Sequence, residues 1–246
     1  MADNIEGRNP VLEALKAGRP LTKILLSNTI ERHGAVAEIL HLARTKGIPV
    51  EYVPRQVLDR RSLTSAHQGV MASAAVKEYF DLTDLFSISE ERGEPPFYVI
   101  LDGIEDPQNL GSIIRTADAS AVHGVIIRSR RAVGLTSAVE RASAGAVEHV
   151  PIARVANIAQ AVSILKEHNV WVIGIDREGK MDFTEIDYRP PTAIVIGSEG
   201  GGISDLVKKR CDILASIPMG GKVTSLNAGV AAALVMYEAF RQRRRI

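Results

Sequence analysis

Polar and charged side chains that could do chemistry gather in three glycine-containing loops in the C-terminal part of this chain. The first loop, residues 102–112, contains Asn109 and leads into a predicted helix at 111–122 that carries Arg115. Helical side chains tilt toward the N-terminus, so we expect the Arg115 guanidinium to lie near Asn109, which we expect to cap the helix. A fixed cation and an amide at a helix N-terminus favour a phosphate or ribose site. The same spacing also fits an ordinary Arg115–Asp118 ion pair beside a routine cap.

The second loop, residues 197–204, sets a carboxylate among glycines. Four of its first six residues are glycine, and Glu199 stands among them. Glycines let a backbone approach a ligand closely, and a carboxylate among them is unusual for a plain turn. The loop is not a dinucleotide fingerprint, because no G-x-G-x-x-G follows the preceding strand in the right register. A ligand-binding loop and a flexible surface turn capped by Ser204 both stay open.

The third loop, residues 218–227, ends in Ser225 and Asn227 and leads into an alanine-rich helix. It is not a phosphate-binding P-loop, because Lys222 is followed by valine rather than serine or threonine. Gly229 in the first turn of the helix costs about 1 kcal/mol relative to alanine. The glycine indicates that a cofactor, another subunit or the loop itself approaches this turn closely. The alternative is a plain buried helix. Three such loops suggest one pocket lined mainly by backbone.

The elements that must position these loops alternate between apolar strands and amphipathic helices. We predict strands at 97–101, 124–127, 170–175, 193–196 and 213–217. We predict helices at 111–122, 137–146, 158–168, 204–210 and 224–243. The strands are continuous Val/Ile/Leu runs, typical of a mostly parallel sheet that is covered by helices on both faces. Ligands of such sheets bind beyond the carboxyl ends of the strands, which is where the three loops lie.

A change in composition divides the chain into two modules and a linker. Residues 1–76 form a small basic α/β module, and residues 97–246 form a larger, near-neutral one. In the small module we expect two strands and a helix, at 21–26, 48–53 and 33–46. Residues 77–96 form an acidic linker ending in Pro95-Pro96, which neither a helix nor a central strand accommodates. The stretch 81–92 could still form a short helix.

Composition excludes several classes of protein. With 46% hydrophobic and 24% charged residues in 246, the chain is an ordinary globular protein rather than a disordered or fibrous one. The net charge of +1 is too small to indicate nucleic-acid binding by itself. We expect no membrane span, because the uncharged stretch 223–237 is too short and polar, and no secretory signal. The one cysteine, Cys211, cannot form an internal disulfide, which fits a cytoplasmic protein. The six histidines lack metal-ligand spacing, so we predict no metal site.

The three loops carry sequence motifs that resemble those of the SpoU branch of the SPOUT RNA methyltransferases, over roughly residues 97–246. The motifs are Asn109-Leu110-Gly111-x-x-x-Arg115-x-Ala117, Ile196-Gly197-x-Glu199-Gly200-x-Gly202 and Ile217-Pro218-Met219-x-Gly221-x-x-x-Ser225-Leu226-Asn227. Residues 4–75 are similar to the substrate-binding domain of the same family. Within it, the two-domain layout and residues 145–151 look closest to the bacterial 23S ribosomal RNA guanosine-2′-O-methyltransferases.

The resemblance implies a fold, a cofactor and a reaction. The fold would be an α/β SPOUT domain with a C-terminal trefoil knot, preceded by a small L30e-like α/β RNA-binding domain. The protein would be a homodimer with active sites at the subunit interface, and would transfer methyl from S-adenosyl-L-methionine to a ribose 2′-oxygen of RNA. A guanosine of 23S ribosomal RNA is the expected target. The alternatives are a tRNA methyltransferase of this family and a non-catalytic RNA-binding or ribosome-assembly module.

The resemblance also assigns site residues. Cofactor binding falls to Gly197, Ile217 and Leu226. The catalytic residues would be Asn109, Arg115, Glu199, Ser225 and Asn227. Arginine stays protonated in proteins, so we expect Arg115 to hold a phosphate and stabilise a developing alkoxide while Asn109 orients the ribose. Glu199 would assist proton transfer or hold the donor and the loop.

Several basic residues could contact RNA phosphates. In the small module these are Arg8, Arg19 and Lys23, which could equally be ordinary surface charges. After the strand at 124–127, Arg128, Arg130 and Arg131 are better placed to contact RNA near the pocket. The C-terminal residues Arg241, Arg243, Arg244 and Arg245 could bind RNA or simply complement the end of a helix.

Overall fold

The computed structural model describes residues 3–62, 66–74, 77–130 and 132–244. The chain forms two compact units, the first made of Met1–Glu78 and Leu135–His149, the second of Tyr79–Gly134 and Val150–Ile246. The segment 135–149 thus belongs to the first unit, although the second unit flanks it on both sides in the sequence. The sequence-based boundaries after residues 76 and 96 do not anticipate this insertion and stay a prediction.

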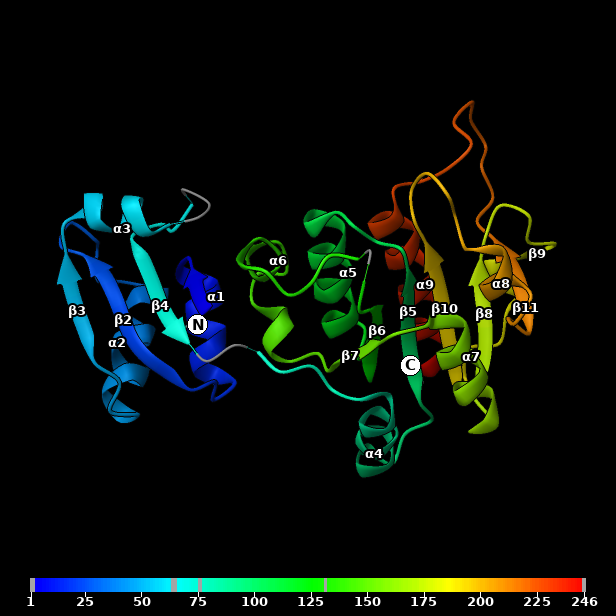
Figure 1. Ribbon diagram of the computed structural model, residues 1–246, viewed down its shortest axis with the longest axis horizontal. Helices are drawn as coiled ribbons and strands as arrows, with labels where there is room; N and C mark the ends of the chain where they lie inside the picture. The colour runs from blue at the N-terminus through cyan, green and yellow to red at the C-terminus, as the bar shows by residue number, and fades with distance from the viewer. Residues whose placement is uncertain (1–2, 63–65, 75–76, 131, 245–246) are drawn as a thin grey trace. The chain divides into compact units, whose positions relative to one another are not determined.

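The first unit is a four-stranded sheet with helices packed on it (Figure 1). Its strands follow the order β1 (Asp3–Glu6), β4 (Val70–Ala74), β2 (Leu21–Ser27) and β3 (Val50–Val53). β4 is antiparallel to both neighbours, whereas β2 and β3 are parallel. The helices are α1 (Arg8–Lys16), α2 (Ala35–Thr45), α3 (Arg55–Arg61), α6 (Ser137–Ala142) and the 3₁₀ helix η1 (Ala146–Glu148). The two strands and the helix expected in this module are β2, β3 and α2.

Buried ion pairs hold the inserted segment in the first unit. The Arg19 guanidinium lies 2.7 Å from a carboxylate oxygen of both Glu140 and Glu148, and all three side chains are almost fully buried. Lys77 donates to the Val147 carbonyl oxygen of the same segment. A buried charge requires an opposite charge close by, because burying an isolated charge costs a large amount of free energy. The expectation that Arg19 contacts RNA is therefore wrong.

The second unit is built on a seven-stranded sheet in which every pairing is parallel. The strands follow the order β7 (Ile152–Val155), β6 (Gly124–Arg128), β5 (Phe97–Asp102), β10 (Thr192–Gly197), β8 (Trp171–Ile175), β11 (Ile213–Ser216) and β9 (Met181–Asp182). The helices are α4 (Leu82–Arg92), α5 (Pro107–Ala119), α7 (Ile158–Glu167), α8 (Asp205–Lys208), α9 (Ala228–Arg243) and the 3₁₀ helix η2 (Phe183–Glu185). The predicted parallel α/β fold is confirmed, and each of the five predicted strands ends within one residue of the observed one.

Burial on both faces explains the continuous apolar strands. One set of alternating residues, such as Tyr98 and Ile100 of β5, packs with α4, α7 and α8 in a single core. The other set, such as Val99 and Leu101, is equally buried and points to the opposite face. There α5 and α9 pack against each other, with α5 touching β6 and α9 touching β10.

The strand order brings three strand ends of interest to one edge of the sheet. The strand β10 lies between β5 and β8, and the later strand β11 lies on the other side of β8. After β11 the chain returns to the β5 side of the sheet, where α9 packs against α5. The loops that follow β10 and β11 lie at the same end of the sheet (Figure 1). The trefoil knot stays a prediction.

The end of α9 is fixed by Arg243. Its guanidinium donates hydrogen bonds to four backbone carbonyl oxygens, those of Pro95, Pro96, Tyr188 and Pro190. It also lies 4.8 Å from the centre of the Phe97 ring. Burial lowers the pKa of this group to about 10. Arg243 is thus a structural clasp rather than an RNA contact, and Arg245 lies outside the described residues.

Candidate active site

The first loop leads into α5 earlier than the sequence indicates. Pro107 occupies the first helical turn, and the carboxylate of Asp106 accepts a hydrogen bond of 3.1 Å from the Asn109 backbone N–H. Asp106, not Asn109, is therefore the N-cap, because an aspartate followed by a proline is a strong helix start. The expected start at residue 111 and the expected cap are wrong. Asn109, which is only 7% exposed, therefore does not use its side chain to cap the helix.

Hydrogen bonds of the Asn109 side chain connect the three loops. The Asn109 amide donates to the Glu199 carboxylate at 2.8 Å, and the Asn227 amide donates to the Asn109 side-chain oxygen at 2.8 Å. The Asn227 amide also donates to Glu199, which closes a triangle. Residues 118 positions apart in sequence thus share one network. The structure brings together three of the five residues assigned to catalysis, one from each loop.

Asn227 has a second role at the start of α9. Its side-chain oxygen accepts hydrogen bonds from the backbone N–H groups of Gly229, at 2.9 Å, and Val230, at 3.2 Å. A Cβ on Gly229 would lie 3.2 Å from that oxygen and 3.4 Å from the Ser112 hydroxyl oxygen of α5. The close neighbours that favour glycine here are therefore the loop itself and α5.

The glycine loop after β10 is a closed turn rather than a flexible one. Ser198 and Gly202 exchange two backbone hydrogen bonds, of 3.1 and 2.9 Å. A Cβ on Gly197 would lie 2.0 Å from the carbonyl carbon of Gly202, a distance that no side chain can adopt. Ser204 donates from its backbone N–H and its hydroxyl to Asp102 instead of capping α8 with its side chain. The interpretation as a flexible turn capped by Ser204 is wrong.

A cavity of about 590 Å³ lies against this turn, at the carboxyl ends of β8, β10 and β11. Its lining includes all three residues assigned to cofactor binding, Gly197, Ile217 and Leu226, together with Glu199 and Ser225. A cavity of this size fits a nucleoside-sized ligand. The two asparagines do not line it, but they reach its wall through Glu199.

Arg115 stands apart from this network. It is exposed on α5, and within the described part of the chain no hydrogen bond or ion pair is found for it. The alternative Arg115–Asp118 pair is likewise not found among those residues. No contact with Asn109 is found either, so the expected proximity of the two stays a prediction.

Charged residues at the ends of buried strands were missed by the sequence reasoning. Asp102, at the end of β5, is buried and binds Ser204 of the second loop and the Arg128 guanidinium at 3.2 Å. Asp176, just after β8, lines the cavity together with Lys208. Arg128 is therefore engaged inside the unit, while Arg131 lies outside the described residues. The available signal was an aspartate that terminates an uninterrupted apolar run.

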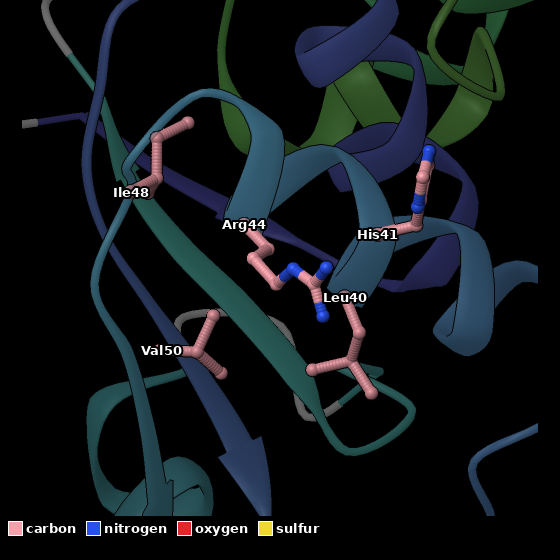
Figure 2. A pocket seen from close by; sticks show the side chains of 5 residues that line it. All are labelled: Leu40, His41, Arg44, Ile48 and Val50. Atoms are coloured by element: carbon pink, nitrogen blue, oxygen red, sulfur yellow. The ribbon is translucent and has the colours of Figure 1, made fainter.

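A second hollow, of about 600 Å³, lies in the first unit and holds none of the assigned residues. Three residues of α2 line it, with Ile48 and Val50 from the following turn and β3. Figure 2 shows the Arg44 side chain extending between the apolar side chains of Val50 and Leu40. Its lining is mainly apolar, with His41 and Arg44 as the two polar side chains.

The described residues contain no group of three or more His, Cys, Asp or Glu side chains able to hold a metal ion. Within the same residues, no helix is long and apolar enough to cross a membrane. Cys211 is half-buried, and burial raises the pKa of its thiol to about 12.

The fold and the site define an α/β protein with a cavity large enough for a nucleoside at the carboxyl ends of the strands of a parallel sheet. The profile of the SpoU rRNA Methylase family matches residues 96–237, and that of the RNA 2′-O ribose methyltransferase substrate-binding family matches residues 4–80. The first match covers more than half of the chain, so the protein belongs to the SpoU family of RNA methyltransferases. The resemblance inferred from the three motifs is confirmed, whereas the closer likeness to the 23S ribosomal RNA enzymes is not.

Relatives of the whole chain support this assignment. The putative TrmH family tRNA/rRNA methyltransferase YacO of Bacillus subtilis is 50% identical over 242 residues, which cover 98% of this chain and 96% of the relative. A putative TrmH family tRNA/rRNA methyltransferase of Staphylococcus saprophyticus is 48% identical over 239 residues, covering 97% and 95%.

Solved structures share the fold. The SpoU methyltransferase AviRb from Streptomyces viridochromogenes, in complex with the cofactor AdoMet, has a TM-score of 0.83 and 28% identity, covering 98% of this chain and 90% of that one. An AdoMet-bound rRNA methyltransferase from Sinorhizobium meliloti has a TM-score of 0.79 and 28% identity, covering 98% and 87%.

Proposed function

We propose that this protein transfers a methyl group from S-adenosyl-L-methionine to a ribose 2′-oxygen of RNA, with a guanosine of 23S ribosomal RNA as the substrate. The observation that carries the proposal is the cavity at the glycine turn, whose wall contains Glu199 of the Asn109–Glu199–Asn227 network. Membership of the SpoU family and the AdoMet complexes of similar structures support the choice of donor.

The cavity fits the donor on physical grounds. Four glycines of the turn, Gly197 and Gly200 to Gly202, line the cavity, so a ligand can approach main-chain N–H and C=O groups there directly. Ile217 and Leu226 offer apolar contact to a flat base, and the volume lies within the usual range for cofactor sites. When bound, the donor supplies an electrophilic methyl carbon. The residues of the cavity fix its orientation, and alignment of this kind contributes on the order of 7–11 kcal/mol to rate enhancement in well-aligned systems.

The acceptor side is organised by the amide–carboxylate network. Two amides hold the Glu199 carboxylate at the cavity wall, and its remaining lone pairs are free to accept the proton of a ribose hydroxyl. Asn109 orients the sugar. Arg115 does not act as a base, because arginine is not deprotonated in proteins, and it holds the adjacent phosphate and stabilises the developing alkoxide. The Ser225 hydroxyl, exposed in the same cavity, completes the acceptor side.

The active form is a homodimer with the site at the subunit interface. Val230, Leu234 and Tyr237 are between 42% and 51% exposed and recur on one face of α9 at helical spacing. A second copy of the chain that packs on this stripe would bury it. The helix α9 packs against α5, which carries the exposed Arg115, so a second copy bound at α9 would bring that guanidinium near an active site.

The experiment incubates the protein with unmodified 23S ribosomal RNA, or with unmodified tRNA, and donor labelled in the methyl group. Alkali-resistant linkages then map each 2′-O-methyl group. Label at one guanosine of 23S RNA supports the proposal. Label on tRNA alone would assign the substrate to tRNA, which the names of the relatives also allow. Absence of transfer to either RNA would support a non-catalytic RNA-binding or ribosome-assembly module.

Two variants test the division of roles. Arg115→Lys should keep donor affinity and lose most transfer, and Glu199→Gln should lower transfer by removing the carboxylate that accepts the proton. Glu167→Gln, which changes an exposed carboxylate at the end of α7, is the matched control and should transfer normally. Normal transfer by both site variants would remove this scheme.

A further inference from the structure

Asp176 is a buried carboxylate in the cavity for which the reaction described above has no use. It follows the last residue of β8, is 8% exposed and lines the cavity. Burying a carboxylate costs free energy unless hydrogen-bond donors surround it. A buried carboxylate in a ligand cavity therefore indicates that a ligand supplies some of those donors.

The Asp176 carboxylate is held from two sides. Lys208 of α8 lies 3.0 Å from its Oδ2, and the backbone N–H of Glu178 donates to its Oδ1 at 3.1 Å. A Cβ on Gly202 would lie 3.2 Å from the same Oδ2, so the glycine turn lies directly against the carboxylate. Hydrogen bonds to Asp176 and Glu178 raise the pKa of Lys208, which therefore stays a cation.

The hydrogen bonds leave capacity on both oxygens. An ionised carboxylate accepts about four hydrogen bonds, and each oxygen here receives one from the protein. Each oxygen can therefore accept one more, so the group suits a ligand with two neighbouring O–H donors. The 2′- and 3′-hydroxyls of a ribose are such a pair, and a carboxylate beyond a parallel strand is a common partner for them.

We propose that Asp176 binds the ribose diol of the donor's adenosine and that Lys208 holds the carboxylate in position for it. This inference rests on the proposed function. Across the sheet edge the order is β5, β10, β8, so Asn109, Glu199 and Asp176 follow three adjacent strands. The strand that leads to Asp176 is thus one strand spacing, about 5 Å, from the strand that leads to Glu199, and two spacings, about 10 Å, from the strand that leads to Asn109. That offset puts the nucleoside half of the donor at Asp176 and its reactive half at Glu199.

The other donor groups of the ligand fit Asp176 less well. The α-ammonium group of the methionine part would sit beside the Lys208 cation, and like charges this close repel. The adenine amine belongs to a flat apolar ring, for which Ile217 and Leu226 are the better surroundings. The ribose is the part of the donor that offers two neutral hydroxyl donors.

The test compares S-adenosyl-L-homocysteine with its 2′-deoxy analogue by calorimetry. Wild-type protein should bind the deoxy analogue about 10- to 100-fold more weakly, the usual effect of losing a hydrogen bond to a charged group. Asp176→Asn and Asp176→Ala should bind S-adenosyl-L-homocysteine more weakly and discriminate little between the two ligands. Loss of discrimination is the decisive readout, because a purely structural role of Asp176 would weaken both ligands equally.

Glu167→Gln provides the matched control. This exposed carboxylate at the end of α7 does not line the cavity, so the variant should keep full discrimination. Equal binding of both ligands by wild-type protein, or discrimination that survives in Asp176→Asn, would overturn the inference and leave the proposed function standing. Absence of any S-adenosyl-L-homocysteine binding by wild-type protein would instead contradict the proposed function itself.

Discussion

Replacing Gly197 by alanine should damage both the stability of the second unit and the donor site. The new Cβ would lie 2.0 Å from the Gly202 carbonyl carbon and 2.3 Å from its oxygen, so the turn must open. Opening breaks the two hydrogen bonds between Ser198 and Gly202. Two such bonds contribute about 0.5–1.5 kcal/mol each, and overpacking adds about 1–3 kcal/mol, so the free energy of unfolding should fall by about 2–6 kcal/mol.

Gly200 offers a control within the same turn. A Cβ there meets nothing within 4 Å, and its φ is not in the left-handed region. Gly200→Ala should therefore change the free energy of unfolding by less than about 0.5 kcal/mol.

Urea unfolding followed by circular dichroism measures both variants, with calorimetric titration of S-adenosyl-L-homocysteine as a second readout. The reasoning is refuted if Gly197→Ala has the same unfolding midpoint as wild-type protein, or if Gly200→Ala loses as much stability as Gly197→Ala does.

Three other expectations concern residues away from the cavity. Arg243→Ala should lower the free energy of unfolding by at least about 2 kcal/mol, because it removes the donor of four carbonyl hydrogen bonds; an unchanged urea midpoint would contradict the clasp. Cys211, with its thiol pKa raised to about 12, should react with a disulfide reagent at pH 8 only slowly in native protein and quickly in urea; equal rates would show an accessible thiolate. Burial is the main cause that lowers the pKa of His123, and the positive charge of Arg92 lowers it further. The Nδ1 atom of His123 accepts a hydrogen bond from the Phe97 backbone N–H. The unfolded chain therefore binds the proton more readily, so the contribution of His123 to stability is complete above about pH 6.5 and is lost as the pH falls through the lowered pKa. The fall in urea midpoint between pH 7.5 and 5.5 should shrink in His123→Gln, and an identical fall in both proteins would contradict this assignment.

Apolar runs made the large sheet predictable from the sequence. A strand buried on both faces must be apolar at every position, so the runs at 97–101 and 193–196 mark β5 and β10 closely. The strands β7 and β9 were missed because they are short and stand at the two edges of the sheet, where less burial is required. The convergence of the three loops followed from the same logic, since the carboxyl ends of parallel strands share one edge.

Contacts between distant residues could not be predicted in this way. In the sequence, Arg19 looks like a surface cation of the small module. Only the fold shows that it pairs with Glu140 and Glu148, which are more than 120 residues away in the sequence. Local competition misled the prediction at α5, where both Asp106 and Asn109 are good caps. Pro107 decides between them, because its fixed φ and missing N–H suit the first helical turn.

The aspartates that end β5 and β8 suggest why the site is made in this way. A turn made of glycines gives a ligand close access to backbone, but it supplies no charge and little selectivity. Asp102 and Asp176 supply charge at the two flanks of that turn, and each is compensated by a cation from a later element, Arg128 and Lys208 respectively. An unpaired carboxylate in these buried positions would be too costly, so each pair must form as the unit folds. The charges of Asp176 and Lys208, which line the cavity, are therefore fixed before any ligand arrives, which is the condition for binding a donor without reorganisation.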